Sequence, residues 1–277
     1  MSEQVRRVAA LFDSLAADYD QSGVAFFQPI AEQLVALMVV RSGEQALDIG
    51  CGRGAATLRL AEAVGAEGSV TAVDLAPAMV EHTRAAAAAA DLPQVLVEVM
   101  DAGQPALPEE SFDLLTSSLV LFFLPEPDTA LTRWLRLLRH GGRAGVTTFG
   151  DYSDTFHAID ALFRPYLPPE MLDARTSGQN GPFESDAGME QLMSAAGAID
   201  VRTVRRSLEV RFADASQWRA WSMSTGQRMM WGLIPEADRS DVFAAAGALL
   251  EEACDESGEI VLRQDVRHTL GRRPEQT

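Results

Sequence analysis

The sequence predicts an α/β protein built around a doubly wound, mostly parallel β-sheet. From residue 45 onward, short apolar runs alternate with helical stretches, which is typical of βαβ units whose helices cover both faces of a sheet. A glycine-rich loop at residues 48–54 separates the first apolar run from the first helical stretch. The chain has 277 residues, of which 47% are hydrophobic, so it can bury a large core without disulfide or metal cross-links.

Two helices are expected before this sheet, and residues 1–42 are predicted to form a helical cap. The first helix is indicated by apolar side chains spaced three or four residues apart. These are Val5, Val8, Phe12, Leu15 and Tyr19. The second begins near Pro29, since proline is favoured at the first helical position, and runs through Val40. It is apolar on most sides, so we expect it to be buried.

Residues 43–150 are predicted to form the cofactor-binding core, with helices between consecutive strands. The five expected strands span residues 45–49, 69–74, 95–100, 112–117 and 143–149. The expected helices span residues 55–64, 77–90 and 127–139.

The rest of the chain is predicted to complete a single domain that spans residues 1–277. Residues 151–198 contain helical stretches of their own and a Gly/Asn/Pro loop at 177–182, so we interpret them as a lid insertion. In residues 199–277, which also contain helices, the segments 201–211 and 259–269 alternate apolar and polar side chains. This alternation predicts a closing pair of strands with one solvated face and an antiparallel member, which brings the sheet to seven strands.

The charged residues narrow the range of functions. The formal net charge is -17, and all 23 basic residues are arginine. Without lysine, Schiff-base chemistry, a lysine general base and a P-loop lysine are excluded. Such an acidic chain is also a poor partner for nucleic acid, because binding to nucleic acid is driven by neutralisation of phosphates.

Cysteine content and hydropathy favour a cytoplasmic location. Cys51 and Cys254 lie far apart and form no Cys-x-x-Cys pair, which argues against a disulfide framework or a zinc site. The N-terminus lacks the apolar region of a secretory signal. The longest apolar run, residues 34–40, is shorter than the roughly 18 residues that indicate a membrane span. We therefore expect no metal and no membrane segment.

The glycine loop and a following carboxylate point to a nucleotide-like ligand. The loop follows an apolar strand and opens a helix, so its backbone can approach a ligand closely. Asp74 ends the second strand 20 residues after Gly54, where a carboxylate can accept both ribose hydroxyls. The same loop fits a nicotinamide-dinucleotide fingerprint if Gly50, Gly52 and Ala55 are taken as its three positions.

Two further carboxylates favour S-adenosyl-L-methionine over a dinucleotide. Asp48 precedes the loop, where its charge would repel a pyrophosphate but attract a ligand's amino group. Asp101 follows the third strand, where it can accept a hydrogen bond from an adenine amino group. The carboxyl ends of parallel strands form the crevice in which such folds bind their ligands.

With these residues in place, the chain resembles the class I S-adenosylmethionine-dependent methyltransferases. The matching stretches are FDSLAADYD (12–20), DIGCGRG (48–54), VDLAPAM (73–79), DA (101–102), FDLLTSS (112–118) and LLRHGGR (137–143). The resemblance covers about residues 10–150 and is strongest to the branch with ubiquinone/menaquinone-type and small-molecule natural-product enzymes. It implies a Rossmann-like seven-stranded sheet with a helical cap, and methyl transfer to a small-molecule acceptor of secondary metabolism.

The resemblance also implies roles for individual residues in holding the cofactor. The glycine loop would lie beneath its methionine and ribose parts, two apolar side chains would flank the adenine, and serines after the fourth strand would face the methionine. The cofactor-binding residues expected in this way are Tyr19, Asp48, Gly50, Gly52, Gly54, Asp74, Leu75, Met79, Asp101, Ala102, Ser117 and Ser118.

The catalytic residues are left open at this point. Many relatives carry a His pair after the fourth strand where this chain has Phe122 and Phe123, so no role of such a His can be transferred. His157, in the lid segment, is the one histidine that we consider as a general base. A Trp- and Met-rich stretch at residues 218–231 either fills the core or lines an acceptor pocket.

The missing His pair also leaves an alternative function open. The protein could bind S-adenosylmethionine without transferring its methyl group, for example as a cyclase. A nicotinamide-dependent oxidoreductase is a further alternative, which the charge of Asp48 disfavours. The oligomeric state, a homodimer included, is not predicted.

Overall fold

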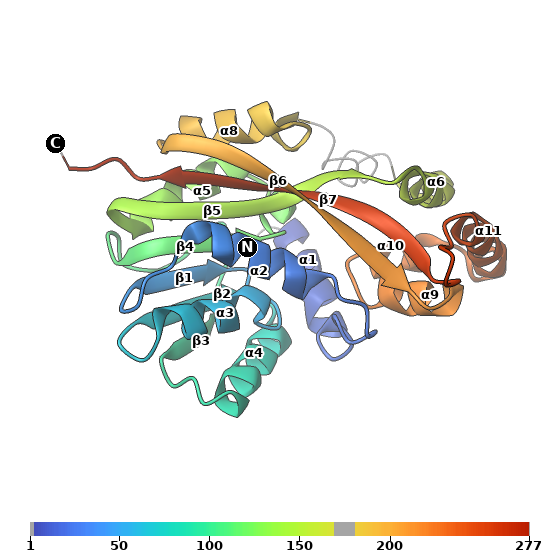
Figure 1. Ribbon diagram of the computed structural model, residues 1–277, viewed down its shortest axis with the longest axis horizontal. Coiled ribbons are helices and arrows are strands. Elements are labelled where there is room, and N and C mark those ends of the chain that lie inside the picture. Colours follow the sequence, from blue (N-terminus) through green and yellow to red (C-terminus); the bar gives the residue numbers. More distant parts are fainter. Residues whose placement is uncertain (1–2, 169–180, 277) are drawn as a thin grey trace.

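A seven-stranded sheet forms the centre of the molecule, in a computed structural model that describes residues 3–168 and 181–276 (Figure 1). The strands are β1 (Gln45–Ile49), β2 (Ser69–Asp74), β3 (Val95–Val99), β4 (Phe112–Ser118), β5 (Leu138–Tyr152), β6 (Ile199–Phe212) and β7 (Ile260–Arg272). Their order is β3-β2-β1-β4-β5-β7-β6. Neighbours from β3 to β5 are parallel, and β7 is antiparallel to both β5 and β6. This confirms the predicted fold class.

Helices cover both faces of the sheet, as expected for βαβ units. On one face lie α2 (Phe27–Met38), α3 (Ala55–Val64) and α4 (Pro77–Ala89), and on the other lie α5 (Pro127–Leu137) and α8 (Asp186–Ala195). The long strands β6 and β7 extend beyond this layer toward α6 (Asp154–Phe163), α9 (Ala215–Met223), α10 (Arg228–Leu233) and α11 (Arg239–Glu251) (Figure 1). A separate apolar cluster holds these last helices against the strands.

The element boundaries match the sequence pattern closely in the core and less well at the edges. The strands β1 and β2 have the predicted bounds. The first helix, α1 (Glu3–Leu15), ends before Tyr19, which lies in the turn that follows. The second, α2, ends at Met38 because Val39 adopts a left-handed conformation with φ of 50°. The predicted loop at 177–182 falls, up to residue 180, outside the described residues.

The predicted solvated face is wrong for the second half of β7. Residues 266–271 are all buried, because β7 runs inside the sheet between β5 and β6. The polar side chains there are paired instead of solvated: His268 Nδ1 lies 2.8 Å from Thr147 Oγ1, and its Nε2 lies 3.3 Å from Gln33 Oε1. The edge strand of the pair is β6, which is mostly exposed.

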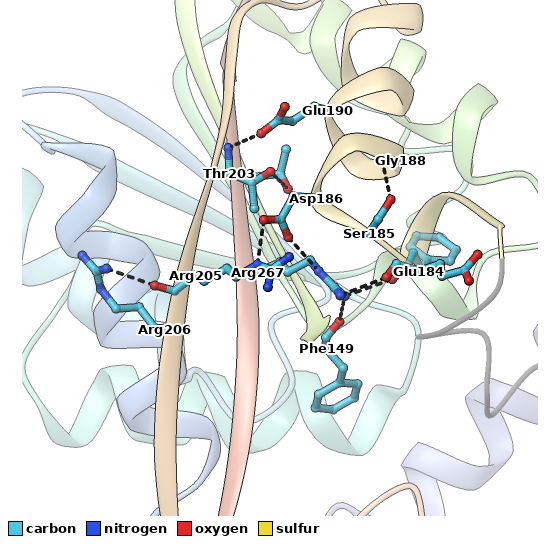
Figure 2. A network of polar contacts seen from close by, with 12 residues as sticks. Phe149, Glu184, Ser185, Asp186, Gly188, Glu190, Thr203, Arg205, Arg206 and Arg267 are labelled. Atoms are coloured by element: carbon cyan, nitrogen blue, oxygen red, sulfur yellow. Dashed lines mark hydrogen bonds and ion pairs between the residues drawn. The ribbon is translucent and has the colours of Figure 1, made fainter. Parts of the chain in front are cut away.

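A buried arginine of β7 anchors the segment that leads into α8 (Figure 2). Arg267 donates to the carbonyls of Phe149, Phe183 and Glu184 at 2.6, 3.0 and 3.0 Å, and to Asp186 Oδ1 at 2.9 Å. Because an unpaired buried guanidinium is costly, this complete set of acceptors fixes the segment against the sheet.

Most of the Trp- and Met-rich stretch fills the core, although Met223 and Met229 are exposed. Trp218, Trp221, Met230 and Trp231 are at most 4% exposed and belong to the cluster under α9, α10 and α11. Of the two interpretations offered for this stretch, the structure supports packing. No helix in the described part of the chain is long and apolar enough to cross a membrane, and Cys51 and Cys254 are both free thiols.

Candidate active site

The glycine loop leaves β1 and folds back onto the end of β2. The Gly50 amide donates to the Val73 carbonyl at 2.8 Å. Gly50, Gly52 and Gly54 have φ values of 75°, 54° and 92°, in a region that side chains rarely adopt. A Cβ on Gly50 would also overlap the side chain of Val120, so the loop requires glycine there for space as well as conformation.

Asp74 is the last residue of β2, and the backbone holds its carboxylate in place. Oδ2 accepts from the Gly52 amide and Oδ1 from the Ala76 amide, both at 2.9 Å. Burial raises the pKa of Asp74, although these hydrogen bonds oppose the shift. Each oxygen keeps a free lone pair, so the carboxylate presents two oriented acceptors beside the loop, where the ribose hydroxyls are predicted.

Asp48 lies beneath the loop and does not line the pocket. Its side chain is 1% exposed, with Oδ2 accepting from Thr57 Oγ1 at 2.6 Å and Oδ1 from Thr116 Oγ1 at 3.0 Å. Burial raises the pKa of Asp48 to about 6 despite these two hydrogen bonds. The predicted direct contact with a ligand's amino group does not fit this geometry, because both oxygens are used to join β1 to α3 and β4.

Residues from β2, α4 and the loop after β3 form the expected adenine side of the site. Leu75 and Met79 line the pocket together with Asp101 and Ala102. Asp101 Oδ1 accepts from the backbone amide two residues further on, at 2.8 Å. The Ala102 carbonyl accepts from the Trp134 indole at 2.7 Å, which fixes this loop against α5.

The end of β4 contributes the opposite wall of the pocket. Ser118 lines it, whereas Ser117 is fully buried and its hydroxyl has no partner among the described residues. After Leu119, whose φ is 61°, the chain turns into a short 3-10 helix, Leu121–Phe123. Phe123 lines the pocket from this helix.

The helix α1 and the turn after it close one side of the pocket. Phe12 of α1 meets Phe123 edge to face, with ring centroids 5.3 Å apart. Tyr19 stacks on Phe27 at 4.7 Å and also lines the pocket. Burial, with the nearby Asp20 and Asp74 carboxylates, raises the pKa of Tyr19 above its ordinary value, so its phenol stays protonated.

The structure brings nine of the twelve predicted residues to one pocket. These are Tyr19, Gly50, Gly52, Asp74, Leu75, Met79, Asp101, Ala102 and Ser118. Asp48, Gly54 and Ser117 lie just behind its wall. The sequence reasoning missed the apolar residues Val5, Val8, Ala9, Phe12, Ala76, Leu119, Val120, Phe123 and Leu124. For the residues of α1, the apolar stripe of this helix was the available signal. It indicates a buried face but does not identify what packs against that face.

Comparison with known proteins identifies the family. The model of a methyltransferase domain matches residues 46–142. A nocamycin O-methyltransferase of Saccharothrix syringae is 34% identical over 273 residues, which are 95% of this chain and 97% of that protein. The chain belongs to the methyltransferase family. An aklanonic acid methyltransferase of Streptomyces sp. (strain C5) is 39% identical over 172 residues, covering 62% of this methyltransferase and 78% of the relative.

Solved structures share the fold at lower sequence identity. A phosphoethanolamine N-methyltransferase of Haemonchus contortus in complex with S-adenosyl-L-methionine is 14% identical, with a TM-score of 0.59 over 95% of this chain and 57% of its own. The [4+2]-cyclase SpnF is 20% identical, with a TM-score of 0.54 over 90% of this chain and 82% of its own. The fold is therefore common to enzymes of different reactions, and the named relatives carry the assignment.

The cofactor of this methyltransferase is S-adenosyl-L-methionine, and the pocket suits it. The glycine loop leaves no room for a Cβ at Gly50, and its backbone borders the pocket. Asp74 offers two oriented carboxylate oxygens that suit the ribose hydroxyls. Leu75 and Met79 offer apolar surfaces that suit the adenine. The nicotinamide-dependent alternative is set aside, because both named relatives are methyltransferases. The enzyme thus methylates a small molecule with S-adenosyl-L-methionine.

Proposed function

We propose that this methyltransferase transfers the methyl group to a carboxylate oxygen of a small organic acid and so forms a methyl ester. The observation that carries the proposal is that the described residues lining the pocket include no base suited to neutral pH. All four histidines lie within the described residues and none of them lines the pocket. The sequence contains no lysine, and Cys51, within the glycine loop, is buried and does not line the pocket.

The titratable side chains that do line the pocket are poor bases. Within residues 3–168 and 181–276, they are Tyr19, Asp74 and Asp101. The raised pKa of Tyr19 keeps its phenol protonated, so it cannot accept a proton. Both oxygens of Asp74 accept backbone hydrogen bonds, and one oxygen of Asp101 does the same. We infer that these carboxylates bind the cofactor and do not remove a proton from the acceptor.

His157, the base considered from the sequence, lies too far along the sheet. It stacks on Tyr152 at 4.0 Å, and its Nε2 is 3.1 Å from Asp151 Oδ1 on the surface. Ser118, at the pocket, pairs with Thr147 of β5, five residues before Tyr152. At roughly 3.3 Å per residue, Tyr152 lies at most about 16 Å along β5 from Thr147, and His157 does not line the pocket.

A carboxylic acid acceptor needs no catalytic base for its methylation, so it suits this pocket. Carboxylic acids with a pKa of roughly 4 are already ionised at neutral pH. S-Adenosyl-L-methionine supplies a methyl group activated by its sulfonium, and the bonding electrons return to sulfur when the acceptor oxygen forms its new bond. The protein then has only to align the acceptor and exclude water, which can lower a barrier by about 7–11 kcal/mol. The apolar wall from Phe12, Leu119 and Phe123 strips solvent from the incoming carboxylate.

The names of the relatives support this choice. One relative is an O-methyltransferase and another acts on an acid, and both belong by name to natural-product synthesis. We propose the same metabolic context here, as one functional domain working in the cytoplasm on free small molecules and not on nucleic acid. The free thiols and the net charge of -17 support this location and partner class.

For the cofactor, we propose that the pocket residues act as the sequence suggests. Asp74 would accept the ribose hydroxyls, Asp101 and Ala102 would meet the adenine edge, and Leu75 with Met79 would flank its ring. Gly50, Gly52 and Ser118 would lie against the methionine part, while Tyr19 closes the site. Asp48, Gly54 and Ser117 would support these groups from behind.

The test is the alkali lability of the transferred methyl group. The purified enzyme is incubated with methyl-labelled S-adenosyl-L-methionine and a small-molecule extract of its source cells, with the Asp74→Ala variant as control. An ester releases its label as methanol in mild alkali, whereas an ether, amine or C-methyl product retains it. We expect alkali-labile label and a rate that stays flat from pH 6 to 9. Alkali-stable label would refute the proposed acceptor class while leaving the methyltransferase assignment intact.

A further inference from the structure

The helix α1 forms a wall over the cofactor pocket. Val5, Val8, Ala9 and Phe12 line the pocket from one side of the helix. Beyond them, α1 packs chiefly on α4, in a small cluster of Ala16, Ala76 and Met79. What keeps α1 over the pocket therefore decides how well the pocket is closed.

One polar anchor joins the end of α1 to the glycine loop. Arg53, between Gly52 and Gly54, donates from its guanidinium to the carbonyls of Ala16 and Ala17. These carbonyls follow the last turn of α1, where helices leave acceptors without intrahelical partners and favour a positive charge. Arg53 is half-buried, so water competes only partly for these bonds.

A second polar anchor joins α1 to the start of α4. Asp13 Oδ1 accepts from the Ala78 amide at 2.8 Å. No side chain of the α4 cap itself fills this role, so Asp13 of α1 satisfies a free amide of the α4 N-terminus. Ala78 lies four residues after Asp74, within the stretch that holds the cofactor's adenosine end.

We propose that Arg53 and Asp13 are positioning residues that hold α1 closed over bound cofactor and thereby set how slowly the cofactor product leaves. Both anchors attach α1 to segments that themselves contact the cofactor: the glycine loop and the turn after β2. Binding that orders these two segments also orders the partners of α1, so closure and occupancy favour each other. The inference rests on the cofactor site and is independent of the acceptor class.

The hinge for such a movement lies between α1 and α2. Asp20 and Gly23 in this segment have φ values of 57° and 77°. Tyr19, which follows α1, stacks on Phe27 at the first turn of α2. This contact fixes Tyr19 against α2. Movement of α1 therefore requires change in only a few turn residues.

The test measures release of S-adenosylhomocysteine from the full chain by stopped-flow fluorescence. The variants are Arg53→Ala, Asp13→Ala and, as a matched control, Arg59→Ala. Arg59 is an exposed arginine of α3 that pairs with Glu32 and Glu62 and does not touch α1. We expect both anchor variants to speed dissociation about tenfold, as expected for loss of a hydrogen bond to a charged group, while Arg59→Ala leaves it unchanged.

Two further measurements separate positioning from direct binding and from general stability. Methylthioadenosine lacks the amino-acid part of the cofactor, so a direct contact between Arg53 and the ligand's carboxylate would leave its release unaffected by Arg53→Ala. A positioning role speeds its release as well. Hydrogen exchange of residues 5–17 should rise in both anchor variants at unchanged thermal stability.

Several results would overturn the inference. One is an effect of Arg53→Ala without any effect of Asp13→Ala; another is unchanged release of methylthioadenosine. Equal dissociation rates in Arg53→Ala and Arg59→Ala would do the same. A wild-type protein that bound no S-adenosylhomocysteine would instead contradict the cofactor site itself, so the two failures are distinguishable.

Discussion

Replacing Asp74 tests the cofactor site most directly, because this side chain shapes the loop and is the one that we propose for the ribose hydroxyls. Its two oxygens already accept amides of Gly52 and Ala76 at 2.9 Å, which orients their remaining lone pairs. Two hydroxyl donors to a charged acceptor contribute roughly 1.5–3 kcal/mol each. Asp74→Ala should therefore weaken binding by about 3–6 kcal/mol, or about 10²- to 10⁴-fold.

Isothermal titration with S-adenosylhomocysteine measures this loss. Asp74→Asn keeps one carbonyl acceptor and should lie between wild type and Asp74→Ala. Asp128→Ala removes the same charge from an exposed site at the start of α5 and should bind like wild type. Thermal unfolding of each variant confirms that the loop still folds. Binding by Asp74→Ala within about threefold of wild type would refute the reasoning, because loss of an acceptor that contacts the ribose should reduce the affinity much more than that.

Three further predictions concern the supports of the site. Gly50→Ala should lower stability by about 1–2 kcal/mol from its positive φ, with an added loss from overlap with Val120; in thermal unfolding, a second change, Val120→Ala, should restore the overlap part only. Burial raises the pKa of Asp48 to about 6 from an ordinary value near 4, so this group binds a proton more tightly in the folded state and its contribution falls as pH rises from about 4 to 6. Asp48→Asn should remove that decline from urea unfolding curves, and a retained decline would reject the assignment. Burial, and secondarily Arg206, lowers the pKa of His268 to about 4, so its contribution falls as pH drops from about 6.5 to 4, and His268→Gln should flatten the curve in that window.

The core of the fold followed from the sequence because its signals were local. The bounds of β1 and β2 matched the prediction, since each is a short apolar run between a turn and a helix. The prediction failed on β7, where alternation suggested a solvated face. His268 and Thr269 are polar, yet they pair with Thr147 and Thr203 across the sheet, and such pairing depends on strands far apart in the chain. No local pattern encodes that neighbourhood.

The site was predictable to the extent that it is built from backbone turns. Glycines and strand-end carboxylates are recognisable one by one, and most of them meet in the pocket. The strand position of Asp48 is visible in the sequence, but its hydrogen bonds to Thr57 and Thr116, which hold it behind the pocket lining, are not. The aromatic wall was missed for the same reason: Phe12 and Phe123 are far apart in the sequence and become neighbours only in the folded protein.

The proposed base-free reaction and the anchoring of α1 are connected, because such a reaction depends on a closed pocket. An enzyme that removes no proton from its acceptor gains its rate from alignment and from excluding water, and both depend on a closed wall. In this protein that wall is α1, and two anchors hold it: Arg53 of the glycine loop, and Asp13 of α1 itself, which accepts from the Ala78 amide at the start of α4. Loosening either anchor should therefore lower the rate of methyl transfer at saturating cofactor as well as speed product release. A variant with fast release but an undiminished single-turnover rate would show that α1 retains the cofactor without contributing to the chemistry.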